Sequence, residues 1–158
     1  MPRKARFTID YPGGLYHVIN RGVNRGNIFF DPKDYIFFLE SLTKTQEKFP
    51  FRLHSFCLMP NHFHLLIQTT TIGLSRILSS LLTRYALRIN RVYNRVGHLF
   101  QGRCKTILCE KEPYFLELVR YISLNPIRSN LVRKPKDWLW SSYRLFCNLK
   151  FPMFKIFH

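Results

Sequence analysis

Runs of β-forming residues and the helical spacing of apolar residues predict that strands and helices alternate along this chain. Residues 15–20 are rich in β-forming side chains and follow a Pro-Gly-Gly turn, which is typical of a strand, and a basic glycine loop follows at residues 21–26. Residues 52–58 and 62–68 form two more such runs with Met-Pro-Asn between them, which indicates a β-hairpin. The segment 107–109 is a candidate for a fourth strand.

Helical spacing of apolar residues predicts three helices, at residues 31–49, 74–93 and 113–125. Asp31 is suited to cap the first helix, because its carboxylate can accept from the free backbone N–H groups, and Pro32 fits the first helical position. The third helix should stop before Pro126, because a proline disfavours helical geometry in the residue that precedes it.

The order of these elements predicts an α+β fold. Strand, helix, strand, strand, helix and strand, with a closing helix, are typical of a ferredoxin-like (RRM-like) fold, in which a split β-α-β unit builds an antiparallel sheet with helices on one face. Apolar residues make up 46% of the 158 residues, enough for a core, and no repeat or linker divides the chain. We expect one domain over residues 1–146 and an apolar C-terminal tail over residues 147–158.

Positive charge dominates the composition and indicates a polyanionic partner. The chain has 25 Lys and Arg against 9 Asp and Glu, a formal net charge of +16. Such an excess favours nucleic acid as the partner, with an anionic membrane surface as the second choice. No apolar run in the sequence is long enough to span a bilayer, and the N-terminus lacks the apolar stretch of a signal peptide, so we expect a cytoplasmic protein with no membrane partner.

Four arginines follow one flank of the second predicted helix: Arg84, Arg88, Arg91 and Arg95. At about 100° per residue they fall within a sector of about 60°, centred about 105° from the apolar face. Charge runs are usually solvated, but such faces normally mix both signs, and residues 48–109 contain no Asp or Glu. We therefore favour phosphate binding over a plain solvated face or a membrane-surface helix.

Two residue pairs could carry chemistry. His62 and His64 lie two apart on a predicted strand, so their imidazoles project from one face about 6.6 Å apart and could form half a metal site. Tyr121 and Asn125 lie four apart on a predicted helix and share a face, and a tyrosine oxygen can displace an ester oxygen at phosphorus. Two histidines on a solvated face, a tyrosine at the core edge and an asparagine capping a short turn explain the same spacings without chemistry.

Several motifs occur in a set order along the chain. They are Tyr16-His-Val-Ile-Asn-Arg21-Gly22, Asn24-Arg25 followed by Ile28-Phe-Phe-Asp31, Met59-Pro-Asn-His62-Phe-His64-Leu-Leu, Gly97-His98-Leu-Phe-Gln101-Gly102-Arg103, Tyr121-Ile-Ser-Leu-Asn125-Pro126 and Trp140-Ser-Ser-Tyr143. Together they resemble the REP-associated tyrosine transposases, a single-tyrosine HUH family similar to insertion-sequence enzymes. The resemblance implies metal-dependent cleavage of single-stranded or hairpin DNA, with strand transfer through a 5′-phosphotyrosine intermediate, in DNA transposition or in processing of repetitive extragenic palindromes.

The resemblance also implies a role for each matching position. Tyr121 takes the place of the nucleophile, His62 and His64 take the metal-binding places, and Asn125 takes that of a third metal ligand. The ion would be Mg or Mn, and because imidazole and amide ligands are softer than carboxylates, we expect Mn to work at least as well as Mg. The residues expected to bind nucleic acid are Arg21, Arg25, Arg84, Arg88, Arg91, Arg95, Gln101, Arg103 and Lys105.

Two other functions stay open at this point. A non-catalytic RRM-like nucleic-acid-binding module would share the fold and the charge, and a metal-dependent nuclease that activates water would leave Tyr121 idle. The family includes single copies and dimers with shared active sites, so a homodimer is one of two expected states. Relatives commonly continue beyond the Trp140-Ser-Ser-Tyr143 stretch, so we expect the tail at residues 147–158 to mark a truncated or frameshifted copy of the catalytic domain at residues 1–146.

Overall fold

The computed structural model describes residues 10–109 and 113–149. Its elements follow in the order β1 (Leu15–Arg21), η2 (Val23–Arg25), α1 (Pro32–Lys48), β2 (Phe51–Met59), β3 (His62–Thr69), α2 (Leu74–Val92), β4 (Lys105–Leu108), α3 (Pro113–Ser123), α4 (Asn125–Arg128), η3 (Pro135–Asp137) and α5 (Tyr143–Phe146). Each strand and helix predicted from the sequence is present within this part of the chain. The predicted apolar tail lies outside the described residues from residue 150 onward.

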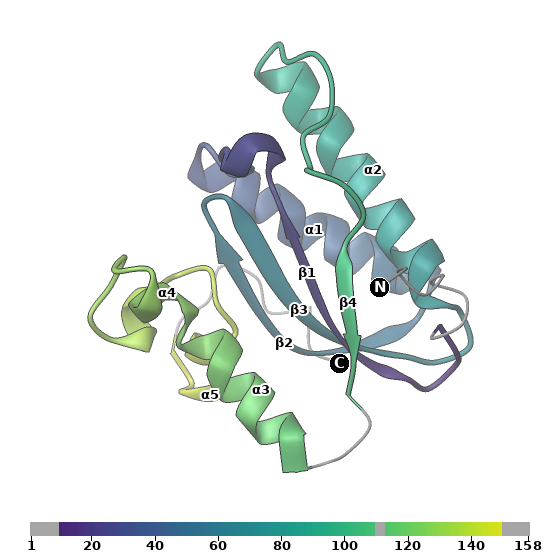
Figure 1. The fold of residues 1–158 in the computed structure, drawn as a ribbon, viewed down its shortest axis with the longest axis vertical. Coiled ribbons are helices and arrows are strands. Elements are labelled where there is room, and N and C mark those ends of the chain that lie inside the picture. The colour runs from purple at the N-terminus through teal and green to yellow at the C-terminus, as the bar shows by residue number, and fades with distance from the viewer. Residues whose placement is uncertain (1–9, 110–112, 150–158) are drawn as a thin grey trace.

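The sheet has the strand order β2-β3-β1-β4, and each neighbouring pair is antiparallel. This arrangement confirms the predicted antiparallel split β-α-β sheet. The helices α1 and α2 pack together on one face, as expected, whereas α3 crosses the opposite face (Figure 1). The expectation of helices on one face therefore holds for α1 and α2, and the chain uses α3 to cover part of the other face.

Alternation along the strands explains why both faces need a cover. Phe63 and Leu65 of β3 point into the larger core with α1 and α2. Leu66 points to the other face, where it packs with Met59 of β2 and Ile122 of α3. Successive residues of a strand face opposite sides of the sheet, so apolar residues at both odd and even positions leave apolar surface on both faces. The helices α1 and α2 cover one face, and α3 covers apolar surface on the other.

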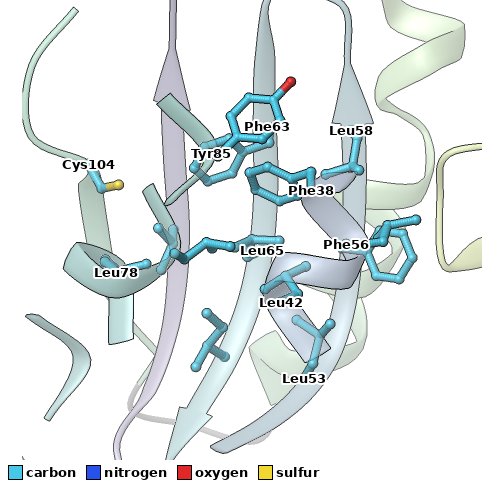
Figure 2. Close-up of a cluster of buried hydrophobic side chains, with 14 of the residues drawn as sticks. Phe38, Leu42, Leu53, Phe56, Leu58, Phe63, Leu65, Leu78, Tyr85 and Cys104 are labelled. Carbon is cyan, nitrogen blue, oxygen red and sulfur yellow. The ribbon is translucent and has the colours of Figure 1, made fainter. Parts of the chain in front are cut away.

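The larger core is built from aromatic and branched side chains of the sheet and of two helices. Phe38 and Leu42 of α1 lie against Phe63 and Leu65 of β3, with Tyr85 of α2 beside them (Figure 2). All five side chains are fully buried. Full burial of such side chains contributes about 1.5–3 kcal/mol each, so this layer contributes strongly to holding α1 and α2 against the sheet.

The predicted N-terminus of α1 is confirmed. The Asp31 side chain accepts from the Lys33 backbone N–H at 2.9 Å, and the Asp34 side chain accepts from the Asp31 backbone N–H at 3.0 Å. This reciprocal capping box satisfies N–H groups that the first turn of a helix leaves unpaired. It sets the point at which the chain leaves the glycine loop and turns into the helical layer.

A C-terminal segment covers the β2 edge of the sheet. The Leu58 N–H donates to the Trp140 carbonyl at 2.8 Å, and the Ser142 N–H donates to the Phe56 carbonyl at 3.0 Å. The Trp140 ring stacks on Tyr35 of α1, with 4.7 Å between ring centroids. An exposed strand edge can pair with other chains, so the Trp-Ser-Ser-Tyr motif has a structural function in protecting this edge. Within the described residues, no helix has the length and apolar character needed to cross a membrane.

Candidate active site

Strand pairing brings the two histidines of the motif beside β1. In the register of the sheet, His62 lies opposite Arg21 and His64 lies opposite Ile19. These residues have the same parity, so their side chains project from the face that α3 partly covers. Asn125 begins α4, which one residue separates from the end of α3, and its side chain reaches the same face, where it contacts both histidines.

The Asn125 side-chain amide contacts both imidazoles. Its Oδ1 lies 3.2 Å from His62 Nε2, and its Nδ2 lies 2.8 Å from His64 Nε2. The two rings are 5.1 Å apart at their centroids and nearly perpendicular, at 81°. Three nitrogen and oxygen groups from two distant parts of the chain therefore converge within hydrogen-bonding distance.

Each imidazole is held on its other side by a second partner. His62 Nδ1 lies 2.7 Å from Asn61 Oδ1, and His64 Nδ1 lies 3.0 Å from His17 Nε2. His17 did not emerge from the sequence as a site residue. Its signal is present in hindsight, since it has the same parity on the first strand as Arg21, but a single histidine on a strand is normally an ordinary half-buried residue.

Burial keeps these imidazoles neutral. Desolvation lowers the pKa of His64 to about 3 and that of His17 to about 4. Burial also lowers the pKa of His62, and its contact with Asn125 opposes part of that effect. At neutral pH each ring therefore has one N–H and one nitrogen lone pair, the form in which imidazole binds a metal ion.

Tyr121 lies on the last turn of α3 next to the histidines. Its ring centroid is 6.0 Å from that of His64 and 6.1 Å from that of His17, with both contacts edge-to-face. The side chain keeps 46% of its surface exposed. A phenol in this position borders the histidine pair and stays open to a large substrate.

Arg128 is a second residue that the sequence did not single out. Its guanidinium carbon lies 4.0 Å from the centroid of the Tyr121 ring, and its Nη2 donates to the Tyr121 backbone carbonyl. The residue follows Tyr121 by seven positions, about two helical turns, which is the one signal that could have found it. A cation stacked on the phenol restricts its orientation and adds positive charge to the opening of the site.

Tyr121, Asn125 and the two motif histidines, His62 and His64, line a cleft of about 630 Å³. Its lining comprises Ile19, Arg21, Arg25, Asn27, Met59, Pro60, Asn61, His62, His64, Tyr121, Asn125, Ser129 and Leu131. The lining contains two arginines and no carboxylate, so the cleft is suited to an anionic ligand. All four residues predicted for catalysis and metal binding, and the predicted Arg21 and Arg25, thus meet in one cavity.

The glycine loop forms one wall of the cleft. The Gly22 N–H donates to the Asn61 carbonyl at 2.9 Å, which joins the loop to the β2–β3 turn. A Cβ at Gly22 would lie 2.0 Å from the Gly26 carbonyl oxygen, so only glycine fits there. Asn24 and Arg25 both adopt positive φ, near 54° and 58°, which marks a tightly constrained loop.

Three further predicted nucleic-acid contacts lie beside the cleft. The Gln101 N–H donates to the Arg21 carbonyl at 2.9 Å, so the Gln101–Arg103 segment runs next to the end of β1. Lys105 pairs with Ile19 in the β1–β4 register and has the same parity as the site histidines. Gln101, Arg103 and Lys105 are all exposed.

The arginines of α2 lie elsewhere. α2 packs on the sheet face opposite the histidines, so Arg84, Arg88 and Arg91 are separated from the cleft by the sheet. Arg84 lines a groove between α1 and α2, and the Arg88 guanidinium lies 4.4 Å over the Phe37 ring. α2 ends at Val92, so Arg95 lies beyond the helix, over Phe30. The structure does not bring these four arginines together with the predicted active site.

Among the residues that the structure describes, no group of three or more His, Cys, Asp and Glu side chains is arranged to hold a metal ion. The convergent set here has a different composition, since its third member is the Asn125 amide. An amide oxygen and two neutral imidazoles together carry no net charge. Such a set would bind a cation weakly until an anionic ligand completed the coordination.

A family match assigns this chain to a class of DNA-processing enzymes. Residues 11–125 match the family described as IS200-like transposases, and that match covers well over half of the sequence. The chain belongs to the IS200-like transposase family, whose members are enzymes that act on DNA.

Individual relatives are similar to this chain over most of its length. A Haemophilus influenzae protein described as a REP-associated tyrosine transposase is 27% identical over 122 residues, which cover 70% of this chain and 69% of that protein. A solved REP-associated tyrosine transposase bound to a REP hairpin matches the fold with a TM-score of 0.78 at 15% identity, covering 100% of this chain and 98% of the other. A transposase structure from Deinococcus radiodurans matches with a TM-score of 0.52 at 18% identity, covering 77% of this chain and 93% of the other.

Proposed function

We propose that this protein cuts and rejoins single-stranded DNA next to hairpins, through a covalent 5′-phosphotyrosyl bond on Tyr121. The observation that carries this proposal is the convergence of Tyr121, His62, His64 and Asn125 in one basic cleft. Their spacing in the sequence does not by itself bring these residues together, because they come from β3 and from the α3–α4 junction. A shared cavity is what a reaction at one phosphate needs.

The hydrogen-bonding pattern fits a divalent cation held by His62, His64 and Asn125. Asn61 Oδ1 can only accept, so His62 Nδ1 carries the proton and its Nε2 presents a lone pair toward Asn125 Oδ1 at 3.2 Å. With the amide as placed, two acceptors face each other at His62, and a cation between them would remove the repulsion.

Mg²⁺ or Mn²⁺ bound by these residues would polarise the scissile phosphate and stabilise charge that develops on its oxygens. The phenol oxygen of Tyr121 attacks phosphorus as it loses its proton, and the bond to the 3′ oxygen of the preceding nucleotide breaks. The 5′ phosphate remains on the tyrosine, and the released strand ends in a free 3′-hydroxyl. Attack by a 3′-hydroxyl on the phosphotyrosine reverses the step without ATP, which allows strand transfer.

Basic residues around the cleft would bind the DNA backbone. Arg21 and Arg25 line the cavity, and the exposed Arg103 and Lys105 add positive charge at the start of β4. Gln101 is suited to contact a base, because its side chain has both a donor and an acceptor. A hairpin is proposed as the substrate because the solved relative was bound to one. The α2 arginines are proposed to bind a second stretch of backbone on the far side of the sheet.

A non-catalytic RRM-like module is the second candidate, and the sheet composition disfavours it. Such modules stack bases on aromatic side chains at the centre of an open sheet face. Here the central-strand aromatics Tyr16 and Phe63 are both 0% exposed and point into the core under α1 and α2. His62 and His64 occupy the opposite face, which α3 partly covers.

Incubation of labelled hairpin DNA with Mn²⁺ tests the proposal and separates its rivals. We expect a denaturation-resistant protein–DNA adduct that is absent from Tyr121→Phe, and Tyr114→Phe serves as a matched control because Tyr114 is an exposed tyrosine on the same helix. Binding without cleavage would favour the non-catalytic module. Cleavage without an adduct in both wild type and Tyr121→Phe would favour a nuclease that uses water.

A further inference from the structure

His17 is buried directly behind the site, in β1. It is 3% exposed, and its Nε2 lies 3.0 Å from His64 Nδ1. The two rings stack, with centroids 5.2 Å apart and planes at 23°. His17 pairs with Leu66 in the β1–β3 register, so the strand geometry itself sets this contact. The third histidine therefore touches the proposed metal ligand and not the proposed ion.

The hydrogen-bond partners of His64 determine which of its nitrogens carries the proton. A neutral imidazole has one N–H donor and one lone pair. His64 Nε2 faces the Nδ2 donor of Asn125 at 2.8 Å, so this nitrogen accepts and the proton lies on Nδ1. The Nδ1–H then donates to His17 Nε2 at 3.0 Å. One chain of hydrogen bonds runs from Asn125 through His64 to His17.

The direction of this series of hydrogen bonds determines whether His64 can bind a cation in the cleft. With the proton on Nδ1, the Nε2 lone pair of His64 points toward Asn125, where a cation would need it. Without an acceptor at position 17, the Nδ1–H would be buried and unpaired, and the ring would favour the other tautomer. In that tautomer Nε2 carries the proton and, once the Asn125 amide turns over, donates to its oxygen, which leaves no lone pair for an ion.

We propose that His17 is a positioning residue of this enzyme, which accepts the Nδ1–H of His64 and thereby keeps the His64 Nε2 lone pair directed into the cleft. The assignment extends the proposed function, since it concerns the same His62, His64 and Asn125 site. His17 also supports the Tyr121 ring, whose centroid lies 6.1 Å away at 76°. One buried side chain thus orients a metal ligand and borders the nucleophile.

The tautomer can be measured without metal or DNA. Long-range ¹H–¹⁵N spectra of histidine-labelled, metal-free protein should show His64 protonated on Nδ1 in the wild type. In His17→Phe, which keeps a ring of similar size but lacks the acceptor, we expect the proton on Nε2. In His17→Gln, whose side-chain oxygen can accept, the Nδ1–H form should return. Protonation of His64 on Nε2 in the wild-type protein would overturn the proposal.

Mn²⁺ affinity, measured by electron paramagnetic resonance, gives the second readout. We expect about 10- to 100-fold weaker binding in His17→Phe, and recovery in His17→Gln. His54→Phe is the matched control, because His54 is a half-buried histidine whose Nε2 pairs with Gln68 Oε1 and which lies outside the cleft lining. Equal affinity in wild type and His17→Phe would refute the positioning role.

Failure of the proposed function has a different signature. If Mn²⁺ does not broaden the His62 and His64 signals of the wild-type protein, the metal site itself is wrong. The metal-free tautomer of His64 would still decide whether His17 sets the direction of the hydrogen-bond chain. If His17→Phe does not fold, the wild-type spectrum and His17→Gln carry the test.

Discussion

Replacement of Arg128 by Gln should slow formation of the tyrosine–DNA adduct without abolishing DNA binding. The guanidinium carbon lies 4.0 Å from the Tyr121 ring centroid, within the range of a cation–π contact. Because Tyr121 is 46% exposed, the value for exposed sites applies, about 0.5–1 kcal/mol. If the lost cation–π contact stabilises the productive orientation of the Tyr121 ring by about 1 kcal/mol, the population of that orientation falls about fivefold. The cleavage rate should fall by the same factor.

Single-turnover cleavage with saturating labelled hairpin DNA is the appropriate assay, because it removes differences in affinity. Adduct formation is followed on denaturing gels, and DNA affinity is measured separately by fluorescence anisotropy. Arg133→Gln is the matched control, since Arg133 is exposed and does not line the cleft. A rate for Arg128→Gln within twofold of wild type at saturating DNA would show that Arg128 does not orient Tyr121, as would a defect that disappears at saturation.

Four further predictions follow from the structure. Chelation by EDTA should abolish cleavage, and Mn²⁺ should restore it at least as well as Mg²⁺; full activity in EDTA would contradict the proposed site. Burial lowers the pKa of His17 to about 4 and that of His64 to about 3, so the unfolded chain binds more protons than the folded chain between these values and about 6.5. Stability should therefore fall as the pH drops through that window, by up to about 3 kcal/mol for His17 and about 5 kcal/mol for His64. Urea unfolding at pH 7 and 5 measures this, and equal midpoints would count against it. Gly22→Ala should impair cleavage while the core stays folded, because its Cβ would meet a backbone oxygen at 2.0 Å, and normal cleavage kinetics would contradict this. Arg88→Gln with Arg91→Gln should reduce the salt dependence of hairpin binding by up to about two counterions and leave cleavage of short single strands unchanged; an unaltered salt slope would exclude α2 from the DNA-binding surface.

Local patterns were sufficient for the elements. Runs of β-forming residues next to turn residues identified β1 and β3, and the Asp31–Pro32 pair identified the start of α1, because strand propensity, turns and helix capping depend on residues that are close in sequence. Strand alternation, also a local rule, placed His62 and His64 on one face. These predictions needed no knowledge of which other segments lay nearby.

Contacts between distant segments were beyond the reach of periodicity. His17 and His64 are 47 positions apart and meet because β1 pairs with β3 in one particular register. The arginines of α2 share a flank, as their spacing predicts, but the flank belongs to a helix on the far side of the sheet from the cleft. Spacing along one helix cannot state which face of a sheet that helix will cover.

The amino-acid order by itself determined the secondary structure, the antiparallel α+β class, the strong positive charge and the pairing of two imidazoles on one strand face. Tertiary structure decided that α3 crosses the face opposite α1 and α2, and so brings Tyr121 and Asn125 to those imidazoles. It also placed His17 behind His64 and Arg128 over the phenol. Separate segments meet where they do because apolar burial on both faces of the sheet and the strand register are properties of the whole chain.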